Sequence, residues 1–108
     1  MLLINRMAKK LGILLSTPPG HRNFSTVLGL AEEALQDDFG VYLYLIDEGV
    51  RNIREERLLK LTEKGLKLFV CAYGAQNRGI SPSDVAVFGG LAVLGELVNQ
   101  CDRFLSFN

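Results

Sequence analysis

Cys71 is the residue of this chain best placed to do chemistry. It follows a short apolar run, residues 68–70, and precedes residues 72–78, which are compatible with a helix that stops at Gly79. In an open α/β sheet, reactive groups lie where strands end, and the positive end of a following helix favours a thiolate. Because the thiolate is the nucleophilic form of cysteine, the pattern predicts a reactive thiol that is not fully buried. The alternative is a buried structural cysteine, which is common among free thiols.

Arg78 is the nearest basic residue after this thiol. It lies seven residues beyond Cys71, on nearly the same side of a helix but about 10 Å further along its axis. Arg78 can therefore tune the electrostatic potential at the thiol. Direct pairing of the two side chains within one straight helix is not expected.

The loop of residues 17–23, from Thr17 to Asn23, carries a second candidate pair, His21 and Arg22. It is expected to open a helix, whose N-terminus could hold an anion. The loop matches neither G-x-x-x-x-G-K-[ST] nor G-x-G-x-x-G. His21 could approach Cys71 and form a thiolate–imidazolium pair, because both follow strands that end at one edge of a parallel sheet. The alternatives are a site for a small anion or nucleotide, and plain exposure to solvent.

The second cysteine, Cys101, follows an expected helix at residues 91–100. The negative end of a helix disfavours a thiolate, so Cys101 is interpreted as a structural residue. The two cysteines and the one histidine have neither C-x-x-C nor zinc-site spacing, so we expect no metal and no cofactor. Asp47 and Glu48 are interpreted as capping or solvent-exposed groups.

The composition restricts the class of protein. The 108 residues suffice for one domain, which we place at residues 7–108 with residues 1–6 as a candidate N-terminal extension. Twelve basic residues balance twelve acidic ones and are scattered, which argues against a nucleic-acid partner. No apolar run reaches the length of a membrane span, and reduced cysteines point to the cytoplasm. The mean hydropathy of +0.18 predicts an apolar face covered by further copies of the chain.

Short apolar runs alternate with helical patterns along the chain. Strands are expected at residues 11–15, 41–46, 66–71, 84–88 and 103–107. The first helix is expected to have Asn23 or Ser25 as its N-cap, and the second to end near Lys64. Runs that are continuously apolar are typical of strands covered on both faces. We therefore predict a three-layer α/β/α sandwich around a mostly parallel sheet of about five short strands.

Three segments together resemble the DsrE/DsrF-like family, which includes the TusD subunit of the sulfur relay. Cys71, followed after six residues by Arg78 and Gly79, is similar to the C-x6-R-G segment of that family. Residues 85–97 resemble its next strand and helix, and residues 101–107 resemble its closing strand. The resemblance extends from about residue 10 to the end of the chain.

The resemblance implies an assembly and an activity as well as a fold. Members are small α/β/α domains that form trimers or hexamers, and in sulfur-relay members the matching cysteine accepts sulfur as a persulfide. For this chain it implies that Cys71 is the sulfur acceptor, with persulfide donor and acceptor proteins as partners. The alternatives are a non-catalytic oligomeric binding protein, with a small anion or nucleotide at residues 17–23, and a structural subunit of a hetero-oligomer.

Overall fold

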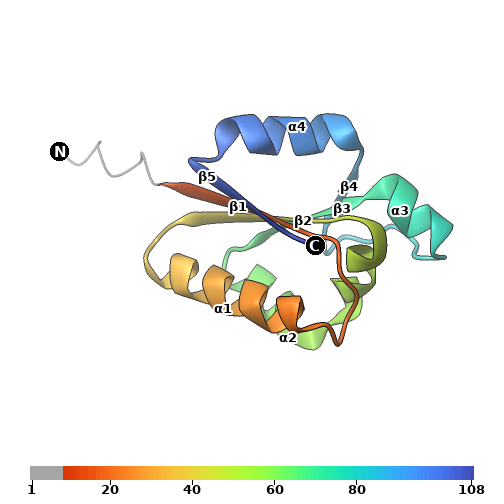
Figure 1. Ribbon diagram of the computed structural model, residues 1–108, viewed down its shortest axis with the longest axis horizontal. Coiled ribbons are helices and arrows are strands. Elements are labelled where there is room, and N and C mark those ends of the chain that lie inside the picture. The colour runs from red at the N-terminus through yellow and green to blue at the C-terminus, as the bar shows by residue number, and fades with distance from the viewer. Residues whose placement is uncertain (1–8) are drawn as a thin grey trace.

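The computed structural model describes residues 9–108 and has three layers built around one central sheet (Figure 1). The strands are β1 (Lys10–Leu15), β2 (Gly40–Leu45), β3 (Lys67–Cys71), β4 (Val87–Gly89) and β5 (Arg103–Phe107). The helices are α1 (Arg22–Gln36), the 3₁₀ helix η2 (Asp47–Arg54), α2 (Glu56–Glu63), α3 (Ala72–Asn77) and α4 (Leu91–Gln100). The extension predicted at residues 1–6 lies outside the described residues. Within residues 9–108, no helix combines the length and apolar character that crossing a membrane requires.

All neighbouring strands are parallel, and their order across the sheet is β4-β3-β2-β1-β5. The predicted α/β fold with a parallel sheet of five short strands is therefore confirmed. The fourth strand is shorter than predicted and begins later, at Val87 instead of residue 84. Because the strands are parallel, the loop after every strand begins at the same edge of the sheet. Cys71 is the last residue of β3 at this carboxyl edge.

Alternate strand residues point to two different helical layers. Leu43 and Val70 point to the layer of α1 and α2, which lie together below the sheet in Figure 1. Cys71 and its paired residue Gly89 point to the opposite layer, because a Cβ built on Gly89 would meet the side chain of Val93 in α4. The fully buried aliphatic residues of the strands each stabilise the fold by about 1.5–3 kcal/mol.

The helix α1 begins earlier than predicted. Its N-cap is His21 and not Asn23 or Ser25, because the Asn23 backbone N–H donates to the Nδ1 atom of His21 at 3.0 Å. Buried residues recur at helical spacing along α1: Phe24, Val27, Leu28 and Ala31. This face holds α1 against the sheet.

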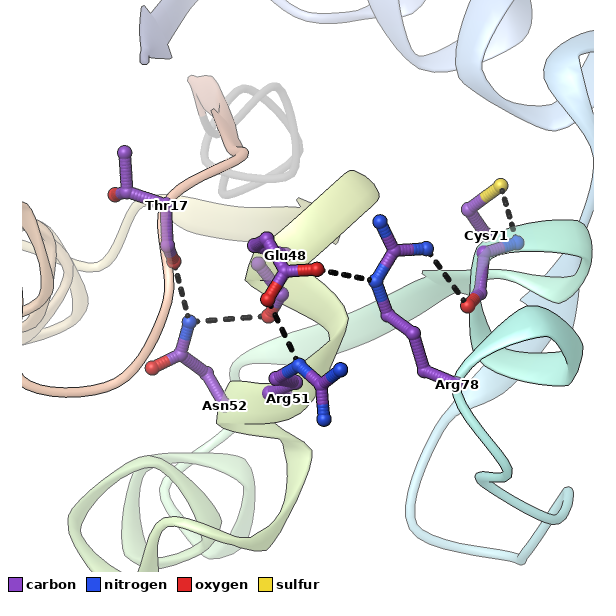
Figure 2. A network of polar contacts seen from close by, with 8 residues as sticks. Thr17, Glu48, Arg51, Asn52, Cys71 and Arg78 are labelled. Carbon is purple, nitrogen blue, oxygen red and sulfur yellow. Dashed lines mark hydrogen bonds and ion pairs between the residues drawn. The ribbon is translucent and has the colours of Figure 1, made fainter.

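The segment between β2 and α2 forms η2, a 3₁₀ helix that the sequence patterns did not predict. A Cβ on Gly49 would clash with the backbone carbonyl oxygen of Leu15, so only glycine lets η2 lie this close to the end of β1. The fully buried Asn52 fixes η2, because its Nδ2 atom donates to the carbonyls of Thr17 at 2.9 Å and Gly49 at 3.0 Å (Figure 2). Asp47 opens η2 with a left-handed φ of 53°. The contacts of Gly49 and Asn52 hold η2 against the end of β1 and the loop that follows it. On another side, η2 lies against α3.

Candidate functional site

Cys71 occupies the junction between β3 and α3. It is the last residue of β3 and the N-cap of α3, and its Sγ atom accepts a hydrogen bond from the Gly74 backbone N–H at 3.4 Å (Figure 2). A backbone donor aimed at sulfur stabilises negative charge on it. The predicted strand-end location is confirmed, but Cys71 is more buried than predicted, with 8% of its surface exposed. Gly90 and Leu91, at the start of α4, line the same cavity as Cys71.

Cys71 lines a cavity of about 360 Å³ at the carboxyl edge of the sheet. The end of β2, η2, α3 and the start of α4 all contribute to its wall, which includes Ile46, Asp47, Asn77 and Arg78. Two further wall residues are large, apolar and exposed: Tyr73 at 73% and Leu91 at 69%. The cavity therefore combines a thiol with an acidic, an amide and a guanidinium side chain, beside an apolar surface open to a partner.

Arg78 lines the cavity, but its guanidinium forms an ion pair with Glu48. Its Nε atom donates to Glu48 at 2.8 Å, and its Nη1 atom donates to the Gly74 carbonyl at 3.1 Å (Figure 2). Glu48 also accepts a hydrogen bond from Arg51 at 2.8 Å, and hydrogen bonds from Arg78 and then Arg51 hold the pKa of Glu48 below its usual value of 4.5. Arg78 is thus a bridge between α3 and η2 that still offers N–H groups to the cavity. The interpretation of Glu48 as a capping or solvent-exposed group missed this role.

Tyr44 is a second polar group beside the thiol, which the sequence patterns did not predict. Tyr44 is fully buried on the α4 side of the sheet, and its hydroxyl donates to the carbonyls of Gly89 and Gly90, each at 3.2 Å. Burial raises the pKa of Tyr44 to about 12, and the neighbouring Cys71 raises it as well. Tyrosine and leucine alternate along β2, which places Tyr42 and Tyr44 on one face of the sheet. This alternation gave no signal for a position next to Cys71.

The polar side chains of residues 17–23 form hydrogen bonds within that loop and with the start of α1. The His21 Nδ1 atom caps α1, Asn23 donates to the Thr17 hydroxyl at 3.3 Å, and Arg22 is exposed as the first residue of α1. Among residues 9–108, neither His21 nor Arg22 is part of the wall around Cys71. The structure thus does not bring these predicted residues to the thiol within one chain. An Nδ1 atom that accepts a backbone hydrogen bond belongs to a neutral ring, not to an imidazolium ion.

Cys101 lies at the other edge of the sheet. It is the C-cap of α4, and the backbone N–H of the next residue, Asp102, donates to the carbonyl of Lys10 at the start of β1. Burial raises the pKa of Cys101, in spite of an opposing effect of Lys10. Both cysteines are free. Within residues 9–108, no three His, Cys, Asp or Glu side chains come together as metal ligands.

Comparisons with known proteins agree with this architecture. The model of the DsrE/DsrF-like family matches residues 9–107. The chain belongs to the DsrE/DsrF-like family. Among solved structures it is similar to the YchN protein of E. coli, with a TM-score of 0.78 and 22% identity over 94% of this chain and 100% of that one. It is also similar to BT1422, a conserved protein of unknown function from Bacteroides thetaiotaomicron, with a TM-score of 0.75 and 16% identity over 99% of each chain. No curated protein matches the chain.

In this DsrE/DsrF-like domain, the C-x6-R-G segment contains one complete helix. Cys71 is the N-cap of α3 and Arg78 is its C-cap. Gly79 follows with a φ of 70°, the left-handed conformation that ends helices and that glycine adopts without strain. The spacing of the segment thus sets the length of α3. It places the Cys71 backbone at one end of the helix and the Arg78 backbone at the other, while the Arg78 guanidinium reaches back to the Gly74 carbonyl.

Proposed function

We propose that the protein is a sulfur carrier that accepts sulfane sulfur as a persulfide on Cys71 and passes it to a partner protein. The observation that carries the proposal is the thiol of Cys71 in a cavity at the carboxyl edge, in a chain that belongs to the DsrE/DsrF-like family. The Gly74 N–H donates to the sulfur, and the Arg78 guanidinium lines the same cavity. Both kinds of group favour an anionic sulfur over a neutral one.

The transfer is a thiol–disulfide type of exchange. The Cys71 thiolate attacks the outer sulfur of a donor persulfide, R–S–SH, whose S–S bond breaks as the new S–S bond forms. The products are the Cys71 persulfide and the donor thiolate, so no external oxidant is required. Transfer to the next protein repeats the exchange with Cys71 as the leaving thiolate. The chemistry requires a reduced thiol, and we therefore propose a cytoplasmic location.

The position of Cys101 supports a carrier over a redox catalyst. Cys101 lies next to the start of β1, whereas Cys71 lies at the opposite edge of the sheet. A persulfide on Cys71 therefore has no second thiol of the same chain close enough to attack it. The sulfur remains on Cys71 until a partner thiol reaches the cavity.

Intact-mass measurement tests the proposal directly. The wild type, Cys71→Ser and the matched control Cys101→Ser are incubated with glutathione persulfide. We expect the wild type and Cys101→Ser to gain one sulfur atom that dithiothreitol removes, and Cys71→Ser to gain none. An adduct that survives in Cys71→Ser, or a wild type that takes up no sulfur, overturns the proposal.

We also propose that the chain forms homotrimers or homohexamers. Several large apolar side chains are exposed on α3, β4 and α4, among them Tyr73, Val87, Leu91 and Val98. Such surfaces are unfavourable in water and are commonly covered by another subunit. Light scattering after size-exclusion chromatography tests this, with three or six times the chain mass expected. A monomeric mass at micromolar concentration contradicts it.

A further inference from the structure

We propose that Tyr44 donates a hydrogen bond to the negatively charged sulfur of Cys71, both as the thiolate and as the persulfide anion. For the persulfide state, this assignment rests on the proposed function. When Cys71 is a neutral thiol, the Tyr44 hydroxyl donates its hydrogen bond to the backbone carbonyls of Gly89 and Gly90. Ionisation of the sulfur turns the hydroxyl proton toward the sulfur.

Three adjacent strands bring the two side chains together. Tyr44 of β2 pairs with Phe69 of β3, and Cys71 is two residues further along β3, so both side chains point to the α4 side. Cys71 pairs with Gly89 of β4, and the carbonyl of that same glycine accepts the Tyr44 hydroxyl at 3.2 Å. The Tyr44 side chain therefore reaches across β3, the strand of the thiol. It has no exposed surface, so water does not compete for its proton.

The hydroxyl has one proton and two carbonyl partners. Tyr44 lies 3.2 Å from the carbonyl oxygens of both Gly89 and Gly90, which is longer than the usual O–H···O distance of about 2.8 Å. The Gly90 carbonyl also accepts from the backbone N–H groups of Val93 and Leu94, at 3.1 and 3.4 Å. The Tyr44 proton can therefore leave Gly90 without leaving that carbonyl unpaired. An anionic sulfur is the stronger acceptor, because its hydrogen bond is charge-assisted.

The titration of Tyr44 agrees with a donor role. Burial raises its pKa to about 12, and Cys71 contributes both as a negative charge and as a hydrogen-bonding neighbour. A phenol that a neighbouring thiolate makes harder to ionise keeps its proton and shares it with the sulfur. Tyr44 is thus a donor at neutral pH and not a base.

Tyr44 is not the only polar group near the thiol. Gly74 of α3 provides a backbone N–H, and the charged side chains in the wall are Asp47 of η2 and Arg78, whose Nε atom is paired with Glu48. The β4–α4 junction contributes no charged side chain to the wall. Asn77 and Tyr73 are uncharged polar residues of the same wall. Removal of the Tyr44 hydroxyl therefore leaves the charges around the thiol unchanged.

The experiment compares Tyr44→Phe with Tyr42→Phe, both in the Cys101→Ser background so that one thiol remains. Tyr42 lies on the same strand and the same face, with its ring stacked on Phe69 at 6.4 Å. The rate of iodoacetamide alkylation is followed across pH. We expect Tyr44→Phe to react about tenfold more slowly at neutral pH and to reach the parent rate in strong alkali, as loss of one charge-assisted hydrogen bond predicts. Tyr42→Phe is expected to follow the parent.

A Tyr44→Phe profile that superimposes on the parent overturns the proposal. Alkylation needs no persulfide, so a shifted profile in a protein that takes up no sulfur would refute the carrier function and leave the Tyr44 assignment standing. If thermal melting shows that Tyr44→Phe does not fold, 3-fluorotyrosine at position 44 replaces it. This stronger donor is expected to move the profile to lower pH, and an unmoved profile overturns the assignment.

Discussion

Cys71 and Cys101 each lie where a helix meets a strand, but at opposite helix ends and opposite edges of the sheet. Cys71 precedes α3, so a free backbone N–H of the first turn donates to its sulfur. Cys101 follows α4, where the unpaired backbone groups are carbonyls, and burial there raises its pKa. The polarity of the adjacent helix and the surrounding groups therefore separate a thiol suited to carry charge from one suited to remain neutral.

Two glycine substitutions should show the largest difference between the Cys71 and Cys101 junctions, measured as loss of stability. A Cβ on Gly12 would lie 2.9 Å from the Cys101 Sγ atom and even closer to the ring of Phe104, so Gly12→Ala should destabilise the fold by about 1–3 kcal/mol. A Cβ on Gly74 would lie 3.6 Å from the Cys71 Sγ atom, an ordinary contact, so Gly74→Ala should stay within about 1 kcal/mol of the wild type. Urea unfolding measures both. Equal losses of stability would show that the two junctions are packed alike.

Competitive alkylation should give the next largest difference. At neutral pH we expect Cys71 to react with iodoacetamide faster than Cys101, because burial raises the pKa of Cys101 and leaves it with less thiolate. Peptide mapping at short reaction times gives both rates in one sample. Equal rates would mean that helix polarity does not distinguish the two thiols.

Acid should lower the stability that comes from the Glu48 network beside the Cys71 cavity. The pKa of Glu48 is lowered in the folded protein by hydrogen bonds from Arg78 and Arg51. Stability from this network is therefore present above the usual value of 4.5 and is lost as pH falls through the lower, folded value. Glu48→Gln should be less stable than the wild type at neutral pH, and the difference should shrink in acid. A difference that is constant with pH contradicts this.

Alkali should lower the free energy of unfolding through the ionisation of Cys101, and this is the smallest effect that we expect. Because the folded pKa of Cys101 is raised, the unfolded thiol ionises first, from about its usual value of 9.0, and stability falls as pH rises above it. Cys101→Ser should remove that part of the decline. Urea unfolding of both proteins from pH 8 to pH 10 measures the difference, and the contribution of Tyr44, whose folded pKa is also raised, is common to both proteins. If the serine variant declines as steeply as the wild type, Cys101 is not the group responsible.

Much of the fold was predictable, because each strand has its own apolar run. The last strand at residues 103–107 and the helix at residues 91–100 match β5 and α4 residue for residue. The 3₁₀ helix η2 was not predicted, since it depends on the approach of Gly49 to the Leu15 backbone and on the bonds of the buried Asn52. No local pattern encodes contacts of that kind.

The site was predictable only where it is local in sequence. Cys71 was identified from the end of one strand. The bond from Arg78 to Glu48 spans 30 positions, and that from Tyr44 to Gly89 spans 45, so neither has a signal in spacing. The expected approach of His21 to Cys71 does not occur, because β2 separates β1 from β3 and because the ring of His21 caps α1.

The pairing of β1 with β5 has a consequence for the order in which the chain can fold. Lys10 and Asp102, which are hydrogen-bonded at the start of these strands, are 92 positions apart. A chain that emerges from the ribosome N-terminus first has β1 available long before its outer partner exists, and contacts this distant in sequence form slowly. Until residues 103–107 emerge, one edge of β1 remains open to pairing with other chains. β2, β3 and β4 precede that point, so the strands around Cys71 can be assembled while the opposite side of the sheet is still exposed.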